Sequence, residues 1–141
     1  MSELFHSFKL QVMSANGIFY DGKATEVVLP CDDGLLALLA NHEEMIVAVY
    51  DGILKIRDGE GNWIIGVVSL GSAQFFSDNS CIILVNTIEK PEDIDRLRAE
   101  EAYRFALDHL KEDQTTKEYQ KSAAGLARAK ARLEGVSKYG K

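Results

Sequence analysis

The sequence predicts an α+β protein: an N-terminal antiparallel β-sandwich followed by a C-terminal antiparallel hairpin of two helices. Residues 1–87 alternate between short β-branched runs and turn signals of Gly, Asp or Asn, spaced roughly every 8 to 12 residues as in sandwiches and flattened barrels. After Pro91 no proline occurs, and Ala, Leu and charged residues recur at helical spacing. The boundary between the two parts is therefore predicted between residues 87 and 88.

Nine short runs in the first part are expected to be strands. The opening run alternates apolar and polar residues, as a half-buried strand does. Asp21-Gly22 is read as a turn between two strands, and Pro30 is expected to end the strand before it. The expected strands are 8–13, 18–20, 25–29, 35–39, 45–50, 53–57, 63–68, 73–76 and 81–85.

The first helix is expected to run from about Glu92 to about His109. Pro91 suits a first helical turn because its missing N–H would have no partner there. Glu92 and Asp93 place negative charge at the positive end of the helix dipole. The apolar stripe of this helix consists of Ala99, Ala102, Tyr103, Ala106 and Leu110.

The second helix is expected to begin at a capping box formed by Thr115 and Glu118 and to stop at Gly135. The short loop 112–114 requires the two helices to pack antiparallel. Because alanine buries little area, the seam between the helices is weak and the hairpin can open. The face expected to pack consists of Tyr119, Ala123, Leu126 and Leu133.

The charge distribution restricts the partners. The chain carries a net charge of −6, and the first 87 residues hold four basic against eleven acidic residues. A phosphate backbone needs clustered Lys and Arg, so nucleic acid is not an expected partner. Glu3 and His6 interrupt the N-terminal apolar residues, which argues against a signal peptide. No apolar run approaches the roughly 20 residues that span a bilayer, so any membrane association is expected through a complex.

Two cysteines and three histidines leave one enzymatic alternative open. Cys31 and Cys81 lie in apolar runs, where buried reduced thiols are the expected state. A small cysteine hydrolase would use Cys31 with His42, although no nucleophile motif surrounds either residue. No pair of histidines has metal-ligand spacing, so no metal is expected.

Four local features carry a resemblance to a known family. Residues 17–22 follow the first strand as the return arm of a hairpin, and Gly34 and His42 bracket an apolar loop. Ser69-Leu70-Gly71 interrupts two strands, and residues 94–99 fit the pattern Ile/Leu-Asp-x-x-Arg-Ala at the start of the first helix. Together these features resemble the bacterial-type epsilon subunit of F-type ATP synthases, called delta in mitochondria, over essentially the whole chain.

The loop between Gly34 and His42 departs from the pattern of that family. The family usually has Gly-x-x-Gly followed by Pro-Gly-His-x-Pro. Here Asn41 replaces a glycine, and asparagine also accepts a positive φ. The four replacements are Ala37, Ala40, Asn41 and Glu44.

The resemblance implies a sandwich of about ten strands in residues 1–87 and a regulatory hairpin in residues 88–141. It implies a non-catalytic rotor subunit, peripheral to the cytoplasmic face of a bacterial membrane. The sandwich would dock on the gamma subunit and the c ring, with Gly34 and His42 at the interface. The hairpin would either fold on the sandwich or extend toward the alpha/beta head and inhibit ATP hydrolysis. No cofactor is required.

The resemblance also implies a regulatory ATP site, because the folded hairpin of some bacterial members binds ATP. A further arginine of those members is Phe105 here. The implied ATP contacts are Glu89, Ile94, Asp95, Arg98, Ala99, Arg128 and Arg132.

The same residues have a plainer interpretation. Asp95 and Arg98, three residues apart, would form an exposed ion pair contributing well under 1 kcal/mol. Arg128 and Arg132 lie one turn apart and repel unless an anion or an acid sits between them. A third alternative, beside the rotor subunit and the hydrolase, is a free-standing ATP-sensing module, which would be a stable monomer without a gamma partner.

Overall fold

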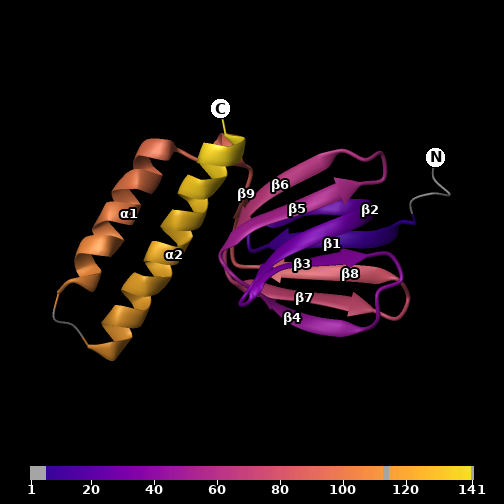
Figure 1. Cartoon of the computed structure of the whole chain (residues 1–141), viewed down its shortest axis with the longest axis horizontal. Helices are drawn as coiled ribbons and strands as arrows, with labels where there is room; N and C mark the ends of the chain where they lie inside the picture. Colours follow the sequence, from indigo (N-terminus) through magenta and orange to yellow (C-terminus); the bar gives the residue numbers. More distant parts are fainter. Residues whose placement is uncertain (1–5, 113–114, 141) are drawn as a thin grey trace.

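The computed structural model describes residues 6–112 and 115–140, so residues 1–5 and the predicted loop residues Asp113 and Gln114 lie outside the described part. Figure 1 shows a β-sandwich with a two-helix hairpin at one end. The predicted fold class is confirmed. The strands are β1 (Phe8–Ser14), β2 (Gly17–Cys31), β3 (Gly34–Leu39), β4 (Met45–Val49), β5 (Gly52–Asp58), β6 (Trp63–Val68), β7 (Gly71–Phe76), β8 (Ser80–Val85) and β9 (Ile88–Glu89). A 3₁₀ turn at Pro91–Asp93 leads to α1 (Arg96–Leu110) and then α2 (Thr116–Tyr139).

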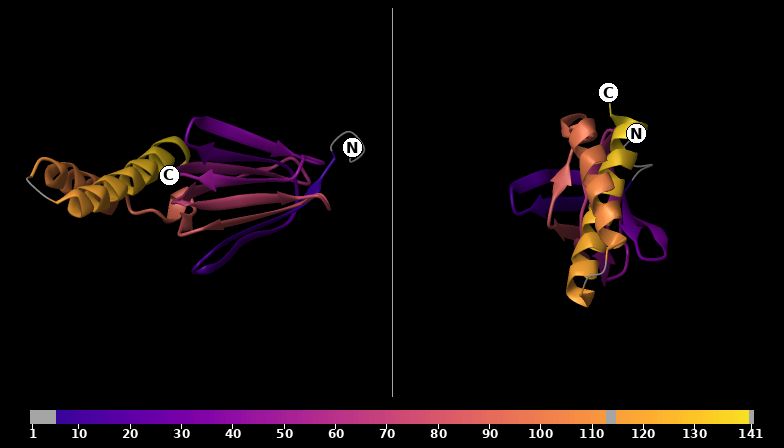
Figure 2. Two further views of the ribbon diagram at one scale, coloured as in Figure 1. Left: turned by 90° about the horizontal axis from the view of Figure 1, so that it is seen from below. Right: turned by 90° about the vertical axis from the view of Figure 1, so that its left-hand side faces the viewer.

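The longest strand, β2, belongs to both layers of the sandwich. Its first half pairs with β1, from Gly17 opposite Ser14 to Ala24 opposite Phe8. Its second half pairs with β3 on one side and β5 on the other. The strand order β4-β7-β8-β1-β2-β5-β6-β9, with β3 beside β2, therefore folds over at β2 into two layers (Figures 1 and 2).

The sheet is not wholly antiparallel. β1 and β8 run parallel, with Leu10 opposite Cys81, whereas the other described strand pairs are antiparallel. β9 pairs with β6, so the sheet extends to Glu89, two residues into the segment assigned above to the hairpin.

The core lies between the two layers and receives alternate side chains from each strand. The rings of Phe8 and Phe75, from β1 and β7, lie with centroids 5.4 Å apart in its centre. Burial of these apolar side chains is the main stabilising contribution to the sandwich. Large side chains with almost no exposure are Phe8, Leu10, Val12, Val27, Leu29, Leu38, Leu54, Ile56, Phe75 and Ile83.

The turn expected at Asp21-Gly22 is wrong, because β2 continues through it. Asp21 lies opposite Gln11 and Gly22 opposite Leu10, so β1 offers a hydrogen-bonding partner along this whole stretch. Pro30 does not end the strand either, since β2 runs on to Cys31. A local turn signal is overridden here by a neighbouring strand that pairs across it.

The predicted start of the first helix and the predicted end of the second helix are both corrected. α1 starts at Arg96 rather than Glu92, because Ile94 is extended and Asp95 is the N-cap. α2 does not stop at Gly135 but continues to Tyr139. Gly135 has a packing role there, since a Cβ atom at this position would overlap Cγ2 of Val67 on β6. The predicted cap at Thr115 is confirmed, because its hydroxyl accepts a hydrogen bond from the N–H of Glu118.

The seam of the hairpin is made of alanine, as expected, although several of its positions differ. Ala99 and Ala106 of α1 are buried, whereas Ala102 is exposed. On α2, Tyr119 is exposed, and the predicted positions 123, 126 and 133 are half-buried. The fully buried residues of α2 are Ala129, Ala131, Gly135 and Val136.

Gly71→Ala is expected to lower the free energy of unfolding by about 3 kcal/mol. A Cβ atom there would overlap the carbonyl oxygen of Leu84 and lie 2.6 Å from Cα of Val85, and this backbone cannot move without breaking the ladder of β8. Gly59→Ala is the matched control, since its Cβ would meet only Cβ of Lys23 at 3.9 Å. Urea unfolding followed by circular dichroism measures both variants, and equal losses would contradict this packing.

Candidate functional site

A cleft of about 290 Å³ lies where the hairpin meets the sandwich. Six of the seven residues implied above as ATP contacts line it: Glu89, Ile94, Asp95, Arg98, Ala99 and Arg132. The seventh, Arg128, lines a groove of about 590 Å³ between α1 and α2. Ala102 and Arg132 line both hollows, so the cleft and the groove adjoin.

Asp95 fixes the start of α1. Its Oδ1 accepts hydrogen bonds from the backbone N–H groups of Leu97, at 3.0 Å, and Arg98, at 3.3 Å. The carboxylate thereby satisfies two exposed donors of the first turn and lies at the positive end of the helix dipole. The side-chain ion pair between Asp95 and Arg98 considered above is not formed in the described structure, where the bond goes to the backbone of Arg98 instead.

The two arginines of α2 face acids of the sandwich. Nε of Arg132 donates a 2.7 Å hydrogen bond to Oε1 of Glu89, and both side chains are about one-third exposed. Asp51, in the turn between β4 and β5, is close enough for the charges of Arg128 and Arg132 to act on it. Burial raises the pKa of Asp51, and these two positive charges offset part of that rise. The repulsion expected between the arginines is thus relieved by Glu89 and Asp51.

Asp51 is the polar group in this region with the poorest environment. Its Oδ1 is buried and has no hydrogen-bond partner in the part of the chain that the structure describes. Burial disfavours the charged form of this carboxyl group, and the positive charges of Arg128 and Arg132 offset only part of that effect. The junction of sandwich and hairpin therefore combines one good ion pair, at Glu89, with one poorly compensated charge.

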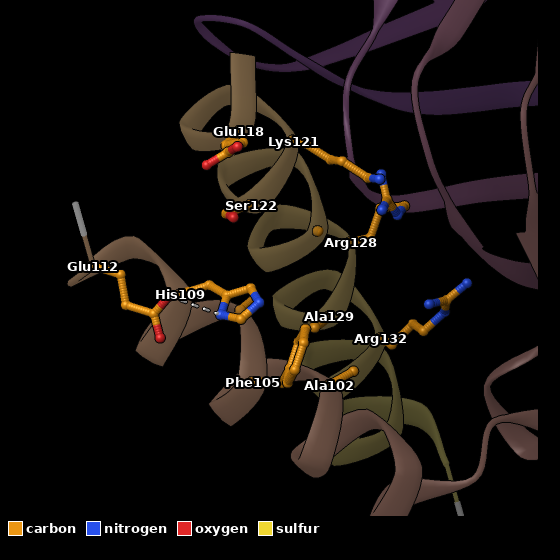
Figure 3. Close-up of a pocket in the computed structure, with 12 residues that line it drawn as sticks. Ala102, Phe105, His109, Glu112, Glu118, Lys121, Ser122, Arg128, Ala129 and Arg132 are labelled. Atoms are coloured by element: carbon orange, nitrogen blue, oxygen red, sulfur yellow. Dashed lines mark ion pairs between the residues drawn. The ribbon is translucent and has the colours of Figure 1, made fainter. Parts of the chain in front are cut away.

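The groove between the helices has an aromatic rim on one side and basic groups on the other. The ring of Phe105 lies with its centroid 4.2 Å from that of His109, one turn further along α1. Arg128 and Lys121 line the opposite wall from α2. Figure 3 shows the arginine side chains leaving α2 in the direction of the strands, while His109 points across the groove.

Sequence reasoning missed three residues of this region: Asp51, His109 and Lys121. The pairing of Phe105 with His109 has a signal in the sequence, because residues four apart on a helix are neighbours. Asp51 has none, since only the folded sandwich brings the turn before β5 beneath α2.

A second candidate surface is the outer face of the layer formed by β4, β7, β8 and β1. Leu84 lies opposite Met13, which lies opposite Ile18 on β2. In the next row, Ile46 and Ile82 lie on either side of Gln74. The exposed fractions of Ile18, Ile46 and Leu84 are 62%, 70% and 51%. Exposed apolar side chains gathered in this way make this face a candidate docking surface.

The comparisons with known proteins decide the family. The family model described as ATP synthase, Delta/Epsilon chain, beta-sandwich domain matches residues 7–91, and that of the long alpha-helix domain matches residues 92–135. The chain belongs to the epsilon-chain family of F-type ATP synthases.

Relatives match over nearly the whole length of this epsilon-family chain. It is 36% identical over 132 residues to the ATP synthase epsilon chain of Ruminiclostridium cellulolyticum, covering 94% of this chain and 97% of the relative. It is 33% identical over 131 residues to the chloroplastic epsilon chain of Coffea arabica, covering 93% and 98%. The epsilon family is a non-catalytic part of the synthase, so the chain is not an enzyme in its own right.

Solved structures share its fold. A chain of the Euglena gracilis mitochondrial ATP synthase, in a structure of OSCP/F1/c-ring, superposes with a TM-score of 0.80 at 17% identity, covering 93% of this chain and 81% of that one. A chain from the central stalk/c-ring structure of the Tetrahymena thermophila enzyme gives 0.65 at 14% identity, covering 94% and 98%. At these identities the likeness supports the fold alone.

The altered loop of this epsilon-family chain is largely a strand. The strand expected at 35–39 is confirmed as β3, so the loop that the resemblance implies between Gly34 and His42 is reduced to the turn after Leu39. Asn41, which stands where the family has glycine, adopts a φ of 62°, and its N–H donates a 2.6 Å hydrogen bond to Oδ1 of Asn79. His42 is half-buried, with its ring centroid 5.6 Å from that of Phe75. Gly34 is exposed at the other end of β3.

The geometry does not support a hydrolase built on Cys31 and His42. Cys31 is opposite Gly34 at the start of β3, and His42 follows its end, about 17 Å of strand away. Burial, with a smaller contribution from Asp33, raises the pKa of the Cys31 thiol, whereas a nucleophile needs a lowered one. Burial likewise raises the pKa of Cys81 to about 12, and both cysteines are free.

The described residues contain no cluster of three or more His, Cys, Asp or Glu side chains that could hold a metal ion. Within the same residues, neither helix is long and apolar enough to cross a bilayer.

Proposed function

We propose that this chain is a central-stalk rotor subunit of a bacterial ATP synthase, peripheral to the cytoplasmic face of the membrane. The observation that carries the proposal is the match of both domains, in order and at nearly full length, to epsilon chains. In this role the sandwich connects the gamma subunit to the ring of c subunits. It performs no chemistry, and its contribution is to hold the two together during rotation.

The exposed apolar face supports a docking role for the sandwich. Ile18, Ile46 and Leu84 would remain in water unless another subunit covered them. We assign this face to the gamma subunit. The end of the sandwich that carries Gly34, and the turn that carries His42, are assigned to contacts with the c ring or gamma.

Leu84→Glu is expected to abolish co-purification with gamma while leaving the isolated chain folded, because the buried charge would be unpaired at the interface. Leu97→Glu is the matched control: Leu97 is also exposed, at 70%, but lies on α1 away from this face. Affinity capture of the tagged chain from solubilised bacterial membranes, with detection of gamma and c, measures both. Normal recovery of gamma by Leu84→Glu would remove this face from the interface.

We further propose that the hairpin regulates hydrolysis by leaving the sandwich and extending along gamma toward the alpha/beta head. The support is the small apolar area that the hairpin buries. The buried residues of its two helices are mainly alanine and glycine, which contribute little apolar area. A hairpin held in this way can detach at modest cost. The folded hairpin would permit hydrolysis, and the extended one would inhibit it.

Truncation after Lys90 is expected to leave a folded sandwich that still binds gamma, and to raise ATP hydrolysis by the assembled enzyme severalfold. The cut retains Ile88 and Glu89 because β9 pairs with β6. Steady-state hydrolysis by synthase reconstituted with the full or the shortened chain measures the effect. Unchanged hydrolysis with normal assembly would show that the hairpin does not inhibit this enzyme.

We propose as a second function that the folded hairpin binds ATP as a regulatory ligand. The support is that Arg98 and Arg132 line the cleft, and that Arg128 and Arg132 line the groove that adjoins it. The polyphosphate would compete with Glu89 and Asp51 for two of these arginines. Phe105 supplies no charge, so the affinity is expected to be weak. Since both helices contribute, ATP would bind only the closed hairpin and shift the population toward it.

Arg128→Ala is expected to weaken ATP binding at least tenfold, because a charge-assisted contact contributes roughly 1.5 to 3 kcal/mol. Lys130→Ala is the control, since Lys130 is exposed and lines neither hollow. Calorimetric titration of the isolated chain with ATP distinguishes them. An absence of heat at millimolar ATP in the wild type, with the hairpin folded, would refute nucleotide binding.

A further inference from the structure

The last two turns of α2 are the part of the hairpin most closely packed on the sandwich. The helical family model ends at residue 135, whereas α2 continues to Tyr139. Gly135 and Val136 are buried. Gly135 touches Val67 of β6 so closely that any Cβ atom would overlap it. The backbone of α2 at Gly135 therefore lies directly against the side chain of Val67.

Two polar contacts flank the buried residues Gly135 and Val136. One turn earlier, Arg132 pairs with Glu89 of β9 at 2.7 Å. One turn later, the ring of Tyr139 lies with its centroid 5.8 Å from Nζ of Lys55 on β5, within the range of a cation–π interaction. Tyr139 also lines a hollow of about 360 Å³ together with Trp63 of β6. This end of α2 is thus in contact with three strands, β5, β6 and β9.

The remainder of the hairpin diverges from the sandwich. α2 lies between α1 and the strands, and its N-terminal end points away from them (Figures 1 and 2). The contacts of Gly135, Val136 and Tyr139 with the strands are consequently concentrated at the C-terminal end of α2. α1 packs on α2, so it moves with α2 when that end separates from the strands.

We propose that residues 135–139 form a C-terminal clasp that holds the hairpin closed on the outer face of β5 and β6 without any bound nucleotide. The clasp goes beyond the functions proposed above, since it requires neither ATP nor a partner subunit. Each of its contacts is individually weak, so it closes the hairpin reversibly. Extension of the hairpin has to begin by withdrawing Val136 and Tyr139 from the sheet.

Trp63 is the only tryptophan of the chain and adjoins the clasp, so it reports on closure directly. Gly135→Ala and Gly125→Ala form a matched pair on α2. Both raise helix propensity, but a Cβ atom at Gly125 meets only Nη2 of Arg128, at an ordinary 3.7 Å. Acrylamide quenching of Trp63 and hydrogen exchange of the α2 amides are measured on the full-length chain without nucleotide.

Gly135→Ala is expected to increase the quenching constant about twofold and to speed exchange at 136–139 about tenfold, with the sheet still protected, whereas Gly125→Ala matches the wild type. Lys55→Gln leaves α2 unaltered and is expected to shift both readouts in the same direction by a smaller factor. The clasp is overturned if Gly135→Ala behaves as Gly125→Ala does, or if Lys55→Gln leaves exchange at 136–139 unchanged. Adding ATP afterwards tests nucleotide binding separately, because a failure of ATP to alter exchange leaves the nucleotide-free result standing.

Discussion

The architecture depends on one strand that serves two sheets. β2 pairs with β1 through its first half and with β3 and β5 through its second half. The two layers are therefore joined by continuous backbone, and the register at Ala24, where β1 gives way to β5, determines how one layer sits on the other. The position of the hairpin follows from this, because α2 packs on β5 and β6. A shift of one residue in β2 would invert its side chains and remove the core that both layers share.

Several interactions, each of them weak, hold the junction between the sandwich and the hairpin. Arg132 has a short ion pair with Glu89, and both side chains keep some contact with water, which limits the strength of that pair. Asp51 lies nearby with a buried oxygen that has no hydrogen-bond partner among the described residues, and burial raises the pKa of its carboxyl group. Alanine and glycine supply most of the packing. No single contact dominates this junction, which is what the proposed opening of the hairpin requires.

The sequence was sufficient to predict the order of the strands and helices, but it was insufficient to predict where several of them begin and end. Alternation of apolar residues and turn signals placed the strands, since side chains in a strand face opposite sides. The error at Asp21-Gly22 arose because the pairing of β1 across it is a tertiary effect. The error at Gly135 arose because a glycine that permits close packing and a glycine that ends a helix look alike in sequence.

In the candidate site too, local features could be predicted from the sequence, whereas contacts made by the tertiary structure could not. Asp95 and Arg98 were found because they share a motif, and the cleft does bring them near Arg132. The cap made by the Asp95 carboxylate is local and could be predicted. The acids that meet the arginines could not, because Glu89 and Asp51 approach α2 only when β9 and the turn before β5 are in place.

The parallel pairing of β1 with β8 has a consequence for how the chain is made. Leu10 and Cys81 are neighbours in the sheet although about 70 residues separate them in the chain. A ribosome has to deliver all of β8 before β1 gains its second neighbour, so β1 has an open edge until then. Non-local pairings of this kind slow folding, whereas the contacts within a helical hairpin are local and form quickly. The hairpin, which follows the strands in the chain, is thus the part able to fold soonest once it is made, but it has a surface to pack on only after β5, β6 and β9 are in place.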